Sequence, residues 1–224
     1  MGCIGPESTI VYYRSFIRLY RERSGDDCYP PLIINSINLT RMVAMFTANE
    51  LPQVADYLVS ELQRLADAGA DCGIIAANTP HIVFNEVRSR SPIPLISIVE
   101  ATCAEAQSRG WKKLGLFGTR FTMQANFYPE VFTPAGIALA IPNEKEQAYI
   151  HDKYMNELVH GILLPETEHG LLEIADRLRQ QEGIEGLILG GTELPLIMRD
   201  GTGSIPFLDT MEIHVRALID ELER

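Results

Sequence analysis

The sequence predicts an α/β protein of two similar lobes, each with a mainly parallel sheet flanked by helices, and a ligand cleft between the lobes. Short aliphatic runs alternate with amphipathic helical patterns along the 224 residues, which is typical of parallel sheets. Two of these runs, residues 74–76 and 187–189, are followed by small residues and then a threonine-containing turn. Because buried parallel strands present side chains at their carboxyl ends, we expect the two turns to face one cleft.

The first half begins with a glycine-containing turn at residues 2–9. Such a turn normally follows a strand, so we expect residues upstream of Met1 to supply a short strand that ends at Gly2. The run at 31–37 is nearly all apolar, and we expect it to lie in the centre of its sheet. The predicted elements are a helix at 9–23, a strand at 31–37, a helix at 51–68, a strand at 72–76, a helix at 79–90, a strand at 94–98 and a helix at 99–109.

The second half opens with a strand at 113–119 that has its own Gly-Thr turn. We expect the final helix to return to the first lobe, which gives one domain of residues 1–99 with 209–224 and another of residues 100–208. The remaining predicted elements are a helix at 123–129, a strand at 138–141, helices at 144–161 and 165–181, a strand at 186–189, a short helix after Leu194, a strand at 205–208 and a helix from 210.

Composition and charge exclude several classes of protein. With 46% hydrophobic residues the chain can form a substantial core, and its net charge of -11 argues against a nucleic-acid or anionic-membrane surface. The four cysteines are far apart and have no spacing typical of a metal site. No apolar run approaches the ~18 residues of a membrane helix. These features predict a cytoplasmic protein with reduced thiols and no bound metal.

Five segments of the sequence carry a resemblance to a known family: residues 5–9, 77–81, 118–123, 191–194 and 207–210. Together they resemble the aspartate/glutamate racemase family, and in particular its broad-specificity branch. They occur in that family's order and spacing and extend over essentially the whole chain apart from the first strand. The resemblance implies a racemase that acts without pyridoxal phosphate, metal or any other cofactor on a small amino dicarboxylate, aspartate or glutamate, and that forms a homodimer.

In members of this family, two cysteines flank the substrate α-carbon, and one removes a proton while the other returns it to the opposite face. The resemblance places these two positions at Ala77 and Gly191. Neither side chain can exchange a proton, so the two-thiol mechanism is not available in this chain. Three explanations remain open: a natural member with altered chemistry, a natural binding protein that lost catalysis, or an engineered variant that traps substrate.

Candidate substrate-binding residues surround the two positions. Hydroxyls, amides and backbone N–H groups at strand ends can hold carboxylates, although each residue could instead serve only to form its turn. Arg41 follows the second predicted strand, where the family places a contact to the substrate side-chain carboxylate; the alternative is a solvated surface arginine. The other candidates are Asn78, Thr79, Thr119, Thr122 and Thr192.

Three further residues could act as a general base in place of the thiols. Glu193 and His81 follow the two turns, and Cys3 lies in the N-terminal glycine turn. Glu193 and His81 could instead fix the turns by hydrogen bonds to the backbone, and Cys3 could be inert. Besides a racemase-family enzyme, two functions therefore remain open: a non-catalytic ligand binder or sensor, and a cofactor-independent decarboxylase or isomerase of a carboxylate.

Overall fold

The computed structural model describes residues 2–3, 6–25, 29–199 and 203–223. It contains two parallel sheets, and both have the same strand order. In the first, β2 (Asn35–Ser36), β1 (Gly2–Cys3), β3 (Gly73–Ala76) and β4 (Leu95–Ile96) lie in that order across the sheet. In the second the order is β6 (Ala138–Ala140), β5 (Lys113–Gly118), β7 (Gly186–Gly190) and β8 (Phe207–Asp209). The two halves therefore repeat one topology, and β3 corresponds to β7.

Helices cover both sheets, as alternating strands and helices require. The longest ones begin and end close to the ranges expected from periodicity. The helices of the described residues are α1 (Pro6–Ser24), α2 (Leu39–Thr47), α3 (Leu51–Asp67), α4 (Phe84–Arg90), α5 (Ile98–Ser108), α6 (Arg120–Gln124), α7 (Phe127–Phe132), α8 (Glu144–Asn156), α9 (Pro165–Glu182), α10 (Leu194–Ile197) and α11 (Thr210–Leu222), with short 3₁₀ helices η1 (Thr79–Val83) and η2 (Leu158–His160). No helix in these described ranges is both long and apolar enough to cross a bilayer.

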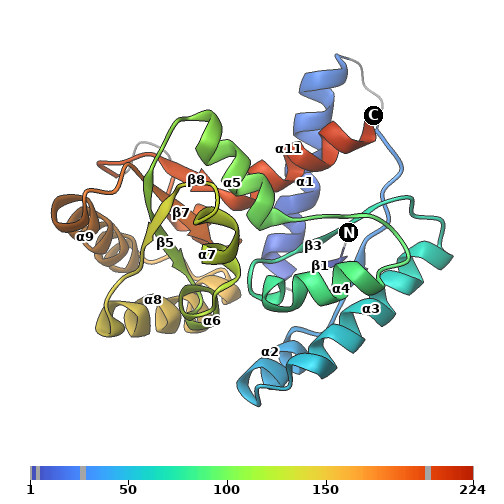
Figure 1. The fold of residues 1–224 in the computed structure, drawn as a ribbon, viewed down its shortest axis with the longest axis horizontal. Helices are drawn as coiled ribbons and strands as arrows, with labels where there is room; N and C mark the ends of the chain where they lie inside the picture. Colours follow the sequence, from blue (N-terminus) through green and yellow to red (C-terminus); the bar gives the residue numbers. More distant parts are fainter. Residues whose placement is uncertain (1, 4–5, 26–28, 200–202, 224) are drawn as a thin grey trace.

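The last helix, α11, brings the C-terminal part of the chain against the first helix. It packs against α1 and α5 (Figure 1). Its apolar face meets α1 and the first sheet in one core cluster, and buried His214 connects them by hydrogen bonds: Tyr12 Oη donates to Nδ1 over 3.0 Å, and Nε2 donates to the Ile96 carbonyl over 3.0 Å. Burial lowers the pKa of His214 to about 4, so this ring is neutral.

Two expectations about the first sheet are wrong. Gly2–Cys3 itself forms a strand, which pairs with both β2 and β3 at the sheet centre, where a strand upstream of Met1 was expected. The run at 31–37 contributes only Asn35–Ser36, at the edge of the sheet, and Ile34 is 39% exposed. The consecutive prolines Pro30 and Pro31 lack backbone N–H groups and favour a loop before the strand.

The helix α2 was not expected from the sequence. It begins at an N-cap, Asn38, whose side chain accepts from the Arg41 N–H over 2.9 Å. Leu39, Met42 and Phe46 then recur at helical spacing and turn inward. This cap and this period are the signals that could have predicted the helix, and α2 forms one wall of the site described below.

Candidate functional site

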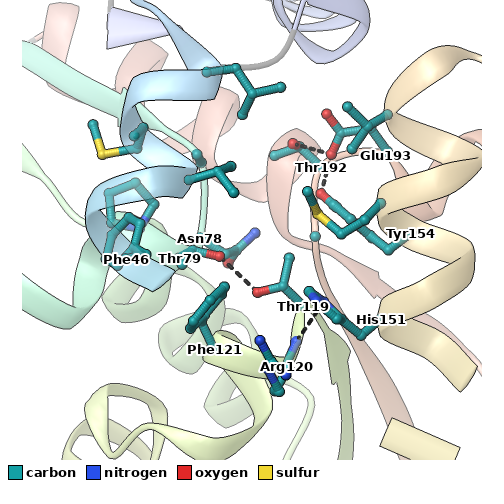
Figure 2. Close-up of a pocket in the computed structure, with 18 of the residues that line it drawn as sticks. Phe46, Asn78, Thr79, Thr119, Arg120, Phe121, His151, Tyr154, Thr192 and Glu193 are labelled. Carbon is teal, nitrogen blue, oxygen red and sulfur yellow. Dashed lines mark hydrogen bonds between the residues drawn. The ribbon is translucent and has the colours of Figure 1, made fainter. Parts of the chain in front are cut away.

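A pocket of about 130 Å³ lies where the carboxyl ends of β3, β5 and β7 face each other. An apolar cavity of about 150 Å³ in another protein holds one benzene molecule, so this pocket suits a ligand of amino-acid size. The helices α2 and α8 form opposite walls (Figure 2). The lining residues are Leu39, Met42, Val43, Phe46, Thr47, Ala77, Asn78, Thr79, Pro80, Thr119, Arg120, Phe121, His151, Tyr154, Met155, Val159, Gly190, Gly191, Thr192 and Glu193.

At the end of β3, Ala77 lines the pocket and His81 fixes its backbone from behind. His81 Nδ1 donates to the Ala77 carbonyl over 2.9 Å, and Nε2 accepts from the Ile98 N–H over 3.3 Å. The ring is buried and stacks on Phe84 at 4.5 Å. Burial, followed by the proximity of His214, lowers the pKa of His81 to about 3. Because both ring nitrogens are engaged and His81 does not line the pocket, this geometry contradicts its alternative role as a general base.

The Asn78 side chain ties the β3 turn to the second half of the chain. Its Nδ2 donates to Thr210 Oγ1 over 3.1 Å, and its Oδ1 accepts from the Tyr128 hydroxyl over 2.7 Å. All three residues are buried. Asn78 therefore lines the pocket with an amide whose orientation is fixed by two partners from the second half.

Three threonine hydroxyls form a triangle across the cleft. Thr79 Oγ1 lies 2.9 Å from Thr119 Oγ1 and 3.1 Å from Thr122 Oγ1, and the last two are 3.3 Å apart. Thr119 is also the N-cap of α6, because its Oγ1 accepts from the Thr122 N–H over 3.2 Å. Thr79 and Thr119 line the pocket, whereas Thr122 is fully buried behind them. Two hydroxyls are thus positioned to contact a ligand, and the third holds them.

At the end of β7, Gly191 lies under the ring of Tyr154 from α8. A Cβ added to Gly191 would lie 3.0 Å from both Cζ and Oη of Tyr154, and closer still to Cε2. The ring therefore fills the space that a side chain on Gly191 would need. The preceding Gly190 is restricted too, since its added Cβ would lie 2.7 Å from the Phe117 carbonyl oxygen.

Glu193 is a buried acid in the pocket wall, only 3% exposed. Its Oε2 accepts a hydrogen bond from the Tyr154 hydroxyl and another, 2.9 Å long, from Thr192 Oγ1. Hydrogen bonds of this kind stabilise a carboxylate away from water. Burial, and then the charge of Glu193, raise the pKa of Tyr154 well above 10, so Tyr154 remains a donor. Figure 2 shows the three side chains grouped on one side of the pocket.

Arg120 and His151 lie together in another part of the pocket wall (Figure 2). The backbone N–H of Arg120 donates to His151 Nδ1 over 3.2 Å, which leaves the proton of the neutral ring on Nε2. Partial burial, and then the Arg120 charge, lower the pKa of His151 below 6.5. The Arg120 guanidinium carbon lies 5.3 Å from the Phe121 ring centre. Arg120 is thus the one residue with a permanent positive charge among those that line the pocket.

One of the sequence candidates lies elsewhere. Arg41 does not line the pocket; its guanidinium carbon sits 4.3 Å from the Tyr57 ring centre, beside a different surface hollow. The Cys3 side chain lies outside the described residues. Burial raises the pKa of the Cys72 and Cys103 thiols, and neither lines the pocket. Among the described residues, no cluster of His, Cys, Asp and Glu could hold a metal ion.

Comparison with known proteins identifies the family to which this fold belongs. The model of the Asp/Glu/Hydantoin racemase family matches residues 1–218. The chain belongs to this family. It is 24% identical over 218 residues to the broad specificity amino-acid racemase RacX of Bacillus subtilis, across 92% of this chain and 89% of RacX.

Two solved structures of the racemase family share the fold over the whole chain. An aspartate racemase homologue from Pyrococcus horikoshii is 36% identical, with a TM-score of 0.84. A candidate Asp/Glu racemase from Yersinia pestis is 27% identical, with a TM-score of 0.88. Each comparison covers 100% of this chain and 98% of the other.

Several residues that line the pocket were not predicted from the sequence. Tyr154 and His151 lie three positions apart on α8, and therefore on one face of the helix. That spacing was visible in the sequence, but not that this face covers Gly191. The apolar residues of α2 were missed because the helix itself was not predicted.

Proposed function

We propose that this racemase-family protein binds a small α-amino acid in the cleft between β3 and β7 and exchanges its α-proton from one side only, through Glu193. The observation that carries the proposal is the asymmetry of the two strand ends. On the β7 side, buried Glu193 accepts hydrogen bonds from Tyr154 and Thr192. On the β3 side, Ala77 offers no ionisable group, and nearby His81 is occupied by the backbone.

The chemistry needs a base and a means of holding the charge that develops. The Glu193 carboxylate takes the proton from the α-carbon, the electron pair of the broken C–H bond moves into the carboxylate group, and the same proton or one from solvent returns. The hydroxyls of Thr79 and Thr119 and the guanidinium of Arg120 can donate hydrogen bonds to that carboxylate. A carboxylate is a weak base for so weak an acid, and each ~1.4 kcal/mol of barrier is tenfold in rate, so we expect slow exchange.

Exchange with solvent deuterium tests the proposal directly. Both enantiomers of several amino acids, with aspartate and glutamate as references because relatives are named for them, are incubated with the protein in D₂O and followed by NMR and chiral chromatography. We expect loss of the α-proton signal without inversion of configuration. Glu193→Gln, which keeps the shape and a hydrogen-bond acceptor, should abolish exchange while binding persists. Exchange that survives in Glu193→Gln would overturn the role of Glu193.

A binder without catalysis is the second candidate, favoured by the lack of any ionisable side chain at Ala77 and Gly191. Binding and exchange are therefore measured on the same samples. An amino acid that binds saturably, with its α-proton unchanged after days in D₂O, would establish the binder and reject the enzyme. Inversion of configuration by the unmodified protein would instead require a second acid opposite Glu193 and contradict the one-sided mechanism.

A further inference from the structure

We infer that the ligand of this pocket is an α-amino acid with one carboxylate and an apolar side chain, not an amino dicarboxylate. The inference rests on the proposed function and narrows it to a substrate class. Three observations carry it: the charges of the lining residues, the apolar surface of α2, and the position of Arg41.

The residues that line the pocket include one permanent cation and one buried acid. Arg120 is positive, buried Glu193 accepts hydrogen bonds as a carboxylate does, and the lowered pKa of His151 makes its ring neutral at pH 7. A neutral zwitterion brings one carboxylate for the single permanent cation. An amino dicarboxylate brings a second carboxylate into a pocket that already contains a buried acid, and like charges in a desolvated site repel strongly.

The wall that would meet the ligand side chain is apolar. Leu39, Met42, Val43 and Phe46 line the pocket from successive turns of α2. The Phe46 ring lies 5.9 Å from the Phe121 ring, centre to centre, so the aromatic surface continues across to α6. Met155 and Val159 add further apolar surface from the opposite side.

This wall is part of the protein core. Met42 and Phe46 are 2% and 6% exposed and belong to the core cluster that includes Leu58 and Ile75. Leu39 and Val43 are half-buried at its pocket edge. A carboxylate placed against such a surface would lose water without gaining donors, which is unfavourable.

Arg41 does not supply a second cation for the pocket. It is the single arginine of α2, but it is exposed, stacks on Tyr57 and lies outside the pocket. With Arg120 beside the strand-end hydroxyls, the arrangement orients an amino acid with its carboxylate toward β5 and its side chain toward α2.

Matched pairs of ligands test the inference. Leucine and aspartate branch at the same carbon, and methionine and glutamate have similar length, so each pair differs mainly in charge. Affinities are measured by titration calorimetry and by ligand-observed NMR with both enantiomers. We expect leucine and methionine to bind at least about tenfold more tightly than aspartate and glutamate.

A gain of charge on α2 provides a matched pair of variants. Val43→Arg places a cation on the apolar wall and should shift the preference toward aspartate and glutamate. Ala44→Arg adds the same charge at the neighbouring exposed position, outside the pocket, and should leave the preference unchanged. Both positions lie partly or fully in solvent, so both variants are expected to fold.

The outcomes separate this inference from the proposed function. If aspartate or glutamate binds as tightly as its apolar partner, the substrate class is wrong and the cleft remains an amino-acid site. If none of the four amino acids binds in either assay, the proposed function fails and the inference fails with it. An equal shift of preference in Val43→Arg and Ala44→Arg would show that net charge, and not the apolar wall, sets selectivity.

Discussion

Tyr154 and Gly191 form a complementary pair: the phenol ring occupies the space into which a side chain on residue 191 would extend. The ring is buried, and its hydroxyl donates to Glu193, which lies two residues after Gly191 in the turn that follows β7. A large residue at 154 and a residue without a side chain at 191 therefore depend on each other, which has consequences for both stability and catalysis.

Gly191→Cys alone should destabilise the protein. The new side chain would overlap the Tyr154 ring, and overpacking typically costs about 1–3 kcal/mol. At ~2–4 °C per kcal/mol for a chain of this size, the melting temperature should fall by several degrees. The same substitution in a Tyr154→Leu background should cost much less, because leucine leaves the space open. Thermal or urea unfolding of the four proteins measures the coupling; equal costs in both backgrounds would refute the overlap.

Restoring both thiols should produce racemisation only when Tyr154 is also reduced in size. The triple variant Ala77→Cys, Gly191→Cys and Tyr154→Leu offers a thiol on each side of the ligand, whereas the two cysteine substitutions alone leave the second thiol displaced by the ring. Chiral chromatography of incubated amino acids measures the product. Equal racemisation by the double and triple variants would show that Tyr154 moves aside without cost.

Stability should fall as the pH drops from about 6.5 toward 4. The folded-state pKa values of His81 and His214 are about 3 and 4, below the unfolded value of about 6.5. The unfolded chain therefore binds more protons in this range, and each histidine contributes a slope of up to about 1.4 kcal/mol per pH unit. Their contribution is fully present above pH 6.5 and is lost as the pH falls.

Urea unfolding at pH 7, 6 and 5 measures this slope. In His214→Gln the amide can still donate to the Ile96 carbonyl and accept from Tyr12, so the slope should decrease with the fold retained. NMR of the unmodified protein provides a second reading, in which both imidazoles stay neutral at pH 5. Protonation of either ring at pH 6 in the folded protein would contradict the prediction.

Thr119→Val should weaken both the fold and ligand binding. The substitution removes the N-cap of α6 and the contact with Thr79, and loss of such a cap typically costs about 1 kcal/mol. Thr119→Ser keeps the hydroxyl and should behave like the original protein. Arg41→Ala is the binding control: with its guanidinium on Tyr57, it should leave affinity unchanged. Weaker binding in Arg41→Ala than in Thr119→Val would place the carboxylate contact on α2.

Periodicity was sufficient to predict elements whose burial is decided locally. The helix predicted at 51–68 is observed as Leu51–Asp67, and the strand predicted at 186–189 as Gly186–Gly190. The strand predicted at 31–37 failed because an apolar run does not distinguish a central strand from a loop that packs on a core. Ile33 and Ile37 do contact the core beside α3, but most of the run forms no ladder.

The site could be located from the sequence, but its chemistry could not be read completely. Turns after two corresponding strands indicated where Ala77, Thr79 and Thr192 would meet. The position of Arg41 and the overlap of Tyr154 with Gly191 depend on how helices lie against the sheets, and this is decided by contacts between residues far apart in sequence. Residue spacing alone does not contain that information.

The contact between α1 and α11 also constrains how the chain is made. His214 lies 202 residues after its partner Tyr12, so a ribosome adds about 200 residues after Tyr12 before the apolar face of α1 can be covered. Until then Tyr12, Phe16 and Leu19 lack the residues of α11 that bury them in the finished core. The second half can form its sheet from residues 113–209 without α1. We therefore expect the nascent first half, whose α1 stays partly uncovered until α11 has been made, to be a part of the chain that chaperones bind.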